Sequence, residues 1–170
     1  PWDSLGIDVV LECTGHFTTT DKSEAHLRAG AKKVVISAPA KDDKTPMVVL
    51  GTDSSKKNAK KSRIISMASC TTNCISPVMQ VLHSKFGVLK SLMTTIHSYT
   101  STQNLVDGPN KDMRRARAAA QNVIPTTTGA ALATTIVIPA LKEKFDGIAV
   151  RVPTACGSLS DITVLLKKNV

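Results

Sequence analysis

The sequence predicts a parallel α/β segment followed by an α+β segment with a mixed or antiparallel sheet. Residues 7–12 and 33–37 are short apolar runs typical of buried strands, and a helix ending near Gly30 lies between them. Such a β-α-β unit has parallel strands and a right-handed crossover. The pattern changes after Cys70, so we predict two domains, residues 1–69 and 70–170.

Further elements of the first segment follow from local patterns. Asp21 and Glu24 form an Asp-x-x-Glu capping pattern, which is typical of a helix start. Residues 47–50 and 64–67 are short apolar runs. The polar, lysine-rich residues 52–62 between them predict a solvated loop or a frayed helix.

The second segment is expected to begin with a long helix. Its pattern runs from Cys70 to about residue 85, and Gly87 is a typical stop. Pro77 removes a backbone donor, so the helix either kinks there or begins later. Residues 88–96 then predict a strand.

The rest of the chain combines a long loop with further regular elements. Residues 98–125 predict a loop whose only helical period lies around 113–120, and long loops in compact domains tend to be functional. Residues 129–141 predict an alanine-rich helix. Residues 148–153 and 159–166 predict strands that we expect to be antiparallel neighbours.

Composition excludes several classes of protein. The chain has 170 residues and four irregularly spaced cysteines, which is not the pattern of a secreted disulfide framework. No signal peptide or membrane-spanning apolar run is visible, so we expect a cytoplasmic protein. The chain opens without methionine and stops within a strand pattern, so we expect a piece of a longer protein.

The basic charge leaves two kinds of partner open. The net charge of +9 permits nucleic-acid binding, but the basic residues lie in separate clusters. With three phenylalanines, one tyrosine and one tryptophan, there is no aromatic platform for bases. The charge also suits an anionic small substrate, which it would steer toward the protein.

Cys70 is the candidate nucleophile. It stands at the predicted start of a helix among small polar residues, and the apolar face of that helix emerges only at Ile75. Unpaired N–H groups at a helix start favour an anion and make a cysteine there more reactive. The alternative is a buried, inert cysteine that acts as a small hydrophobe.

His97 is the candidate partner of Cys70. It ends the strand that follows the helix of the cysteine, so the two could meet as a thiolate–imidazole pair. A solvated or structural histidine is the alternative. A zinc site of Cys70, Cys74, His83 and His97 is disfavoured because the histidines do not form a close pair.

Three further features are typical of anion binding. Hydroxyls and free N–H groups converge at residues 126–129, before a predicted helix. Thr100 closely follows the candidate histidine. Arg151 lies within an apolar strand, where its fork geometry suits a phosphate. An internal salt bridge of Arg151 with Asp146 or Asp161 remains the alternative.

Together these residues fall into ordered motifs that cover essentially the whole chain. The motifs are Glu12-Cys13-Thr14-Gly15-His16-Phe17-Thr18, Lys33-Val34-Val35-Ile36-Ser37-Ala38-Pro39-Ala40, Ala68-Ser69-Cys70-Thr71-Thr72-Asn73-Cys74, His97-Ser98-Tyr99-Thr100, Arg114-Arg115-Ala116-Arg117-Ala118-Ala119-Ala120, Thr127-Thr128-Gly129-Ala130-Ala131 and Arg151-Val152-Pro153-Thr154. In this order they resemble the phosphorylating glyceraldehyde-3-phosphate dehydrogenase family. The chain resembles the middle half of such a protein, from the end of a Rossmann-type NAD-binding domain through most of the catalytic domain.

The resemblance implies a glycolytic oxidoreductase that converts glyceraldehyde 3-phosphate to 1,3-bisphosphoglycerate with NAD(P). The thiolate of Cys70 would attack the aldehyde to give a thiohemiacetal and, after hydride loss, a thioester that inorganic phosphate cleaves. His97 would act as general base and acid. The backbone N–H of Cys70 would stabilise the oxyanion.

The resemblance also implies binding residues and partners. The phosphate of the substrate would be bound by Thr100 and Arg151. The attacking phosphate would be bound by Ser69, Thr71, Thr128 and Gly129. The cofactor would be bound by Thr14, Gly15, Phe17, Ser37 and Ala38. The cofactor would be NAD, with NADP also possible, because the Gly-rich phosphate loop and the ribose-binding acid are not in these residues. The resemblance implies no metal and no membrane, a homotetramer at full length, and little or no activity of this chain alone.

Three other functions stay open at this point. An erythrose-4-phosphate dehydrogenase paralogue would share the cysteine, the histidine and the phosphate contacts. A non-catalytic anion- or RNA-binding fragment would use the basic charge alone. A cysteine hydrolase would use Cys70 and His97 without a nicotinamide.

Overall fold

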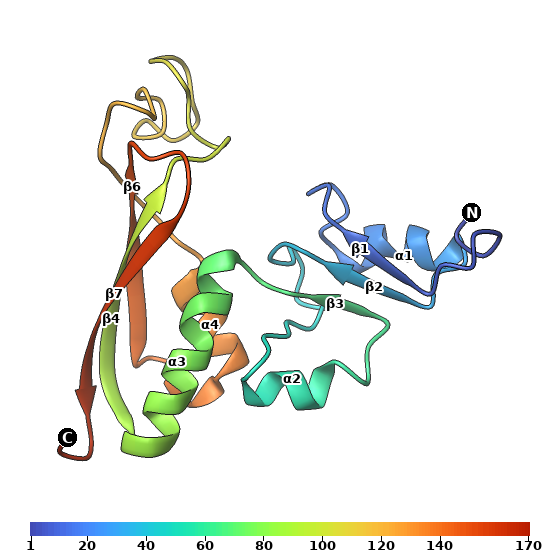
Figure 1. Cartoon of the computed structure of the whole chain (residues 1–170), viewed down its shortest axis with the longest axis horizontal. Coiled ribbons are helices and arrows are strands. Elements are labelled where there is room, and N and C mark those ends of the chain that lie inside the picture. The colour runs from blue at the N-terminus through green and yellow to red at the C-terminus, as the bar shows by residue number, and fades with distance from the viewer. The chain divides into compact units, whose positions relative to one another are not determined.

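The computed structural model describes residues 1–170, apart from the side chains of Lys56 and Lys57 (Figure 1). In chain order the elements are β1 (Val9–Glu12), α1 (Thr20–Arg28), β2 (Lys33–Ile36), α2 (Asp53–Asn58), β3 (Ile64–Ser66), α3 (Cys70–Phe86), β4 (Val88–Ser98), β5 (Ile124–Thr126), α4 (Ala130–Val137), a 3-10 turn η1 (Pro139–Leu141), β6 (Phe145–Val152) and β7 (Ser158–Leu166). They form two compact units, Pro1–Lys85 with Ala133–Ala140, and Phe86–Leu132 with Leu141–Val170.

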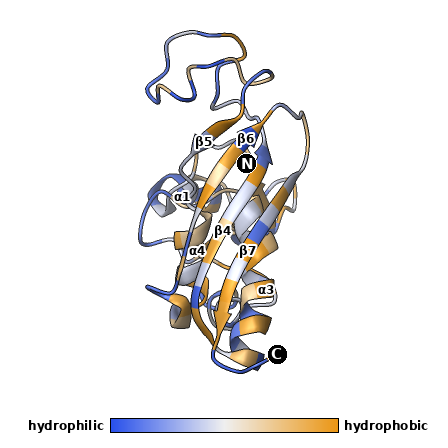
Figure 2. Cartoon of the chain, turned by 90° about the vertical axis from the view of Figure 1, so that its left-hand side faces the viewer, coloured by the Kyte–Doolittle hydropathy of each residue, from blue (hydrophilic) through white to orange (hydrophobic). Residues whose placement is uncertain are grey.

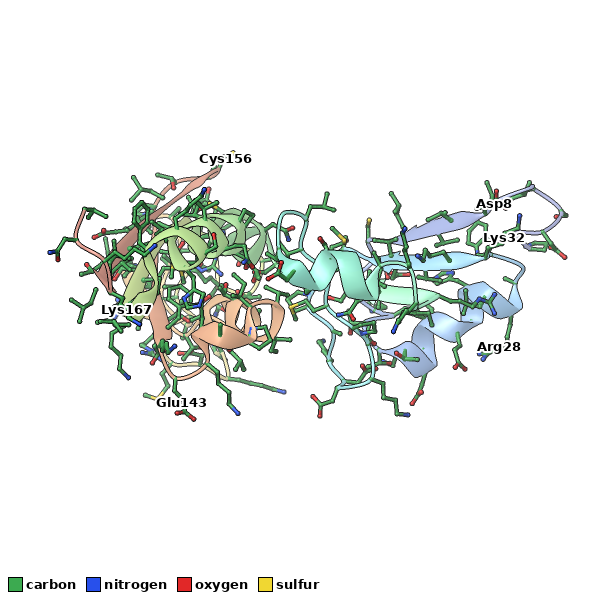
Figure 3. All side chains as sticks on the ribbon, turned by 90° about the horizontal axis from the view of Figure 1, so that it is seen from below. Asp8, Arg28, Lys32, Glu143, Cys156 and Lys167 are labelled. Atoms are coloured by element: carbon green, nitrogen blue, oxygen red, sulfur yellow. The ribbon has the colours of Figure 1, made fainter. Side chains whose placement is uncertain are left out.

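The first unit contains a parallel sheet in the order β1-β2-β3. Its core is formed by Val34, Ile36 and Ile64, and Leu27 of α1 packs against them. Helix α1 connects β1 to β2, so these elements form the β-α-β unit that the apolar runs predict. An ion pair lies where β1 and β2 begin: Lys32 Nζ is 2.7 Å from Asp8 Oδ1 (Figure 3).

The start of α1 differs from the capping pattern of the sequence. Thr19 is the N-cap, and its hydroxyl accepts a hydrogen bond from the backbone N–H of Lys22, so the prediction of a cap at Asp21 is wrong. Asp21 lies inside the first turn, where its negative charge complements the helix dipole. Gly30 follows the helix with a φ of 106°, which a side chain rarely adopts.

Helix α3 begins at Cys70 and continues through Pro77, so the alternative of a later start is wrong. Its inner face carries Ile75 and Met79, both at most 2% exposed. Ser76 also lies on this face, and its hydroxyl is 3.1 Å from that of Thr134, a buried residue of α4. This pair joins two segments of the first unit that are far apart in the sequence.

The second unit contains a mixed sheet in the order β5-β6-β4-β7 (Figure 2). Strand β4 is parallel to β6 and antiparallel to β7, and β5 is antiparallel to β6. The prediction that the last two strands are neighbours is wrong, because β4 lies between them. The fold is nevertheless the predicted one, a parallel α/β part followed by a part with a mixed sheet.

The two faces of the mixed sheet differ sharply. Residues on one face of β4 and β6 are buried, among them Met93, Thr95 and Ala149. The opposite face exposes large apolar side chains from three strands, namely Leu92, Ile148, Leu159 and Leu165. We call this the leucine face.

The connection between β4 and β5 is a long loop, as predicted, but residues 113–120 do not form a helix. Hydrogen bonds between distant parts of the loop hold it instead. The N–H of Asn104 donates to Arg115 O and the N–H of Ala119 donates to Asn104 O, each over 3.0 Å. Asp107 accepts a hydrogen bond from Arg117, and this bond is the largest cause of the lowered pKa of the Asp107 carboxyl.

Candidate active site

Candidate residues of the first unit gather at the carboxyl edge of its parallel sheet. Thr14 and Gly15 follow β1, Ser37 and Ala38 follow β2, and Cys70 comes shortly after β3. The strand ends are tied together across the edge. The N–H of Ser37 donates to Glu12 O over 3.0 Å, and the hydroxyl of Ser66 donates to Ala38 O over 2.7 Å. Ligands of parallel sheets bind at this edge.

The turn after β1 is fixed by the buried carboxylate of Glu12. Glu12 Oε1 accepts hydrogen bonds from both the backbone N–H and the hydroxyl of Thr14. Burial alone would raise the pKa of the Glu12 carboxyl, but the bonds from Thr14 and His26 outweigh it, so this pKa is lowered. Gly15 has a φ of 77°, and a Cβ there would meet no atom within 4 Å, so the turn is open on that side.

Cys70 lies in the first turn of α3 with its side chain exposed. The alternative of a buried cysteine is therefore wrong. Ser69 precedes the helix and its hydroxyl accepts the N–H of Thr72 over 3.1 Å. Asn73 Nδ2 donates to the carbonyl oxygens of Met67, over 2.5 Å, and Ser69, over 2.9 Å, and so braces the segment that leads into the helix.

The hydroxyls beside the cysteine differ in exposure. Thr71 is 7% exposed, and its Oγ1 lies 4.0 Å from Cys70 Sγ. Ser69 is half-buried. Both residues flank the thiol at the helix start, where the backbone N–H groups favour an anion.

His97 and Arg151 come together in the second unit. They are direct partners in the β4–β6 pairing and lie on its buried face. Nη1 of Arg151 is 2.9 Å from Nδ1 of His97 and 2.9 Å from Ser98 O. Nδ1 of His97 is itself 2.8 Å from Ser98 O. Arg151 can only donate and Ser98 O can only accept, so Nδ1 of His97 faces one partner of each kind. A proton on Nδ1 bonds to Ser98 O and leaves Nε2 as the basic nitrogen, whereas a bond accepted from Arg151 places the proton on Nε2.

Thr100 follows β4 in a short turn. Its hydroxyl lies 3.0 Å from that of Thr102, and its N–H donates to Gln103 Oε1 over 3.3 Å. Gln103 is buried, and its own N–H donates to Thr100 O. This turn holds the Thr100 hydroxyl close to the end of the strand that carries His97.

Thr128 and Gly129 precede α4. The hydroxyl of Thr128 accepts a hydrogen bond from the N–H of Ala130 over 3.1 Å. One of the backbone donors at the start of α4 is therefore already in use. Gly129 is exposed. The pairing of Cys70 with His97 joins residues of different units, and it stays a prediction.

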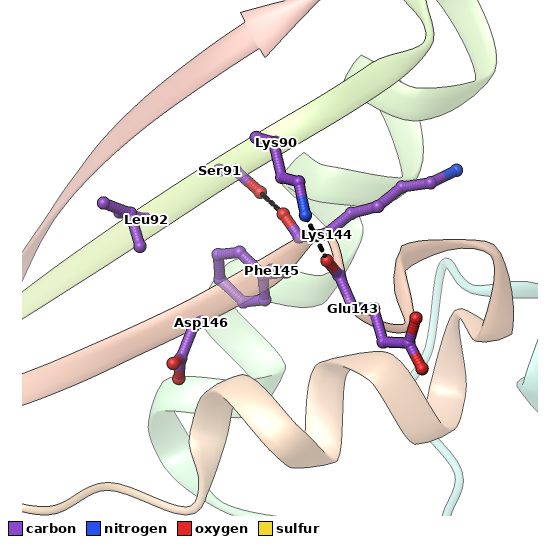
Figure 4. A pocket seen from close by; sticks show the side chains of 7 residues that line it. All are labelled: Lys90, Ser91, Leu92, Glu143, Lys144, Phe145 and Asp146. Atoms are coloured by element: carbon purple, nitrogen blue, oxygen red, sulfur yellow. Dashed lines mark hydrogen bonds between the residues drawn. The ribbon is translucent and has the colours of Figure 1, made fainter.

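Two other features of the described side chains bear on binding. No three histidine, cysteine, aspartate or glutamate side chains among them gather closely enough to hold a metal ion. A cavity of about 500 Å³ opens at the start of β4 and β6 (Figure 4). It is lined by Lys90, Ser91, Leu92, Glu143, Lys144, Phe145 and Asp146, none of which is a candidate site residue.

Among the residues that the structure describes, no helix has the length and apolar character to cross a membrane.

Comparison with known proteins decides the family. Residues 69–170 match the family described as "Glyceraldehyde 3-phosphate dehydrogenase, C-terminal domain". The chain belongs to the glyceraldehyde-3-phosphate dehydrogenase family. It is 54% identical over 170 residues to the glyceraldehyde-3-phosphate dehydrogenase of Streptomyces coelicolor, covering 100% of this chain and 50% of the relative.

Relatives from other bacteria match to a similar extent. The glyceraldehyde-3-phosphate dehydrogenase of Mycolicibacterium smegmatis is 56% identical over 99% of this chain and 49% of its own length. That of Mycobacterium avium is 57% identical over 99% of this chain and 49% of its own length. The chain thus spans about half the length of the curated relatives it matches.

Within this family member, sequence reasoning missed several residues that hold the candidate site. Glu12, His26 and Trp2 form one hydrogen-bonded series behind the turn after β1. The sequence could have indicated Glu12, because it is a charged residue at the end of an apolar strand. A carboxylate buried there needs hydrogen-bond partners. No sequence pattern indicated that His26 and Trp2, from other parts of the chain, would supply them.

Proposed function

We propose that this chain supplies the reactive cysteine and part of the cofactor cleft of an enzyme that oxidises glyceraldehyde 3-phosphate to 1,3-bisphosphoglycerate. The observation that carries the proposal is the shared sheet edge in the first unit. Cys70 and the candidate cofactor residues Thr14 and Ser37 all follow carboxyl ends of its parallel strands. The printed names of the relatives support the same activity.

Cys70 would be the nucleophile. Its exposed thiolate, at a helix start, attacks the aldehyde carbon, and the new C–S bond gives a thiohemiacetal. The N–H groups of the first turn of α3 stabilise the developing oxyanion. Loss of hydride from the same carbon leaves a thioester on Cys70. Inorganic phosphate attacks the thioester carbon, the C–S bond breaks and the acyl phosphate leaves.

His97 would move the protons. Nε2 takes the proton of the Cys70 thiol and gives it to the oxygen of the thiohemiacetal. It takes this proton back as the hydride leaves, and it returns the proton to the sulfur of Cys70 when the C–S bond breaks. The contact of Nδ1 with Ser98 O supports this role because it fixes the orientation of the ring.

Two sets of residues would bind the phosphates. Arg151 and the hydroxyl of Thr100, both near the end of β4, would hold the phosphate of the substrate. The attacking phosphate would bind at the starts of α3 and α4, through Ser69, Thr71, Thr128 and Gly129.

NAD fits the chemistry of the sheet edge, and NADP remains compatible with it. Thr14, Gly15, Phe17, Ser37 and Ala38 would line the part of the cleft present here, and the open side of Gly15 leaves room for a ligand to approach the backbone. Bound NAD supplies the hydride acceptor. We assign this part to a domain of residues 1–69 and the catalytic part to residues 70–170.

The leucine face supports assembly into a homotetramer. Leu92, Ile148, Leu159 and Leu165 are 54–65% exposed on one side of the sheet, which is typical of a surface that another protein covers. The four free thiols suit a reducing compartment such as the cytoplasm.

The decisive experiment uses a hybrid in which residues 1–170 replace the matching half of the Streptomyces coelicolor relative. We expect this hybrid to reduce NAD, seen by absorbance, only when glyceraldehyde 3-phosphate and inorganic phosphate are both present. Cys70→Ser should abolish turnover. A hybrid that prefers erythrose 4-phosphate would point to the paralogue, and a folded hybrid that turns over neither aldehyde would refute the proposal. The 170-residue chain alone should be poorly active or inactive.

A further inference from the structure

We infer that His26 and Glu12 are positioning residues for the cofactor, and that they act through the turn of residues 13–17. The inference rests on the proposed function, because Thr14, Gly15 and Phe17 of this turn are proposed cofactor contacts. Neither His26 nor Glu12 would touch the cofactor. Their part is to hold the turn in one conformation before the cofactor arrives, which lowers the ordering cost of binding.

Glu12 is the centre of the arrangement. It ends β1 with 3% of its surface exposed, and both carboxylate oxygens are used within the chain. Oε1 accepts two bonds from Thr14, and Oε2 lies 2.9 Å from Nε2 of His26. A carboxylate so enclosed holds neighbouring groups in place and is not available to a substrate.

His26 completes the arrangement from α1, and the chemistry of its partners fixes its proton. The indole of Trp2 can only donate, and its Nε1 lies 3.3 Å from Nδ1 of His26. The carboxylate of Glu12 can only accept. The neutral histidine with its proton on Nε2 therefore satisfies both partners at once.

The same histidine also supports the far end of the turn. The rings of Phe17 and His26 are 5.2 Å apart between centroids, and the hydroxyl of Ser23 donates to Phe17 O over 2.8 Å. Thr14 is thus held through Glu12, and Phe17 is held through the imidazole ring. One side chain of α1 controls both ends of the turn that contains Gly15.

Two substitutions separate the roles of the imidazole. His26→Gln keeps an N–H donor for Glu12 but removes the ring, whereas His26→Phe keeps a ring against Phe17 but removes the donor. In the hybrid we expect His26→Phe to raise the Kd for NAD about tenfold, since a buried acceptor loses its partner. His26→Gln should restore most of this affinity. The KM for glyceraldehyde 3-phosphate should stay the same in both.

A purely structural role would give a different result. In that case KM for NAD and KM for the aldehyde would change together, in proportion to the loss of stability, and glutamine would not rescue the Kd for NAD. Fluorescence of Trp2, the single tryptophan of the 170-residue chain, gives a readout independent of activity. It should change most in His26→Phe, because phenylalanine has no acceptor for the indole N–H, whereas glutamine offers its amide oxygen.

The outcomes also separate this inference from the proposed function. If the unsubstituted hybrid binds NAD and His26→Phe binds it equally tightly, the inference fails and the proposed function stands. If the unsubstituted hybrid is folded and binds no NAD, both fail. A selective rise in the Kd for NAD, with rescue by glutamine, supports the inference.

Discussion

Arg151 of β6 is the direct cross-strand partner of His97 of β4, and its Nη1 atom lies 2.9 Å from Nδ1 of the histidine. Both groups also approach Ser98 O, over 2.9 and 2.8 Å. The guanidinium that we propose for substrate phosphate binding is therefore in contact with the imidazole that we propose for proton transfer. A change at Arg151 must be tested in a way that separates these two roles.

Arg151→Gln should lower kcat/KM for glyceraldehyde 3-phosphate in the hybrid by about 10–100-fold, because a hydrogen bond to a charged group contributes about 1.5–3 kcal/mol. Unphosphorylated glyceraldehyde has no phosphate to lose, so its kcat/KM should fall much less. Arg28→Gln, on the exposed surface of α1, is the matched control. Equal losses for the two aldehydes would show that Arg151 acts only through His97.

Cys70 should react with iodoacetate faster than Cys13, Cys74 and Cys156 in the same molecule. All four thiols are exposed, so a difference in rate reports reactivity rather than access. Peptide mass spectrometry across a pH series gives the four rates in one experiment. In the hybrid, His97→Asn should slow the reaction of Cys70 alone. Indistinguishable rates for all four thiols would contradict the assignment of the nucleophile.

The acid stability of the first unit should depend on Glu12. The pKa of this carboxyl is lowered in the folded chain, so its ionised form stabilises the fold above the unfolded value of about 4.3. This contribution is lost as the pH falls through the lower, folded-state pKa. Glu12→Gln should therefore cost about 1–3 kcal/mol at neutral pH and progressively less in acid.

Thermal unfolding of the wild-type chain and of Glu12→Gln, measured between about pH 3 and pH 7, tests this expectation. Glu24→Gln is a suitable control, because Glu24 lies on the exposed surface of α1 and pairs only loosely with Arg28, at 3.4 Å. A stability difference for Glu12→Gln that does not change with pH would show that its carboxylate is not the group responsible.

Gly30→Ala should destabilise the chain more than Gly157→Ala. Both glycines have positive φ, 106° and 86°, so alanine brings a similar backbone cost of about 1–2 kcal/mol at either position. At Gly30 the new Cβ would also lie 2.5 Å from Asp3 Cβ and 2.7 Å from Asp3 N, whereas nothing lies within 4 Å at Gly157. Denaturant midpoints of the two variants compare the costs directly. Equal midpoints would mean that the N-terminal segment moves away without cost.

The local elements were predictable because they depend on nearby residues. The apolar runs around Val34 and Ile64, separated by helix and loop signals, give the parallel sheet its strands. The polar start and apolar inner face after Cys70 give α3 its first turn. Motif order was sufficient to indicate the family, because long motifs in fixed order are specific.

Pairing between distant elements was not predictable in the same way. Strands β6 and β7 are separated by only a short connection, yet β4 lies between them. A two-residue period gives the faces of a strand but not the identity of its neighbours. Likewise, Asp21 and Thr19 are both good capping residues, and only the folded backbone decides which one accepts a bond.

The buried hydroxyl pair of Ser76 and Thr134 has a consequence for how the protein is made. Residues 86–132 are an insertion in the first unit, since the chain returns to that unit at Ala133 before leaving again. The ribosome must therefore release the chain through α4, which ends at Val137, before α3 can meet its complete partner. Until then the buried side of α3 is left uncovered by α4, and truncations ending before Ala133 should be captured by chaperones or degraded.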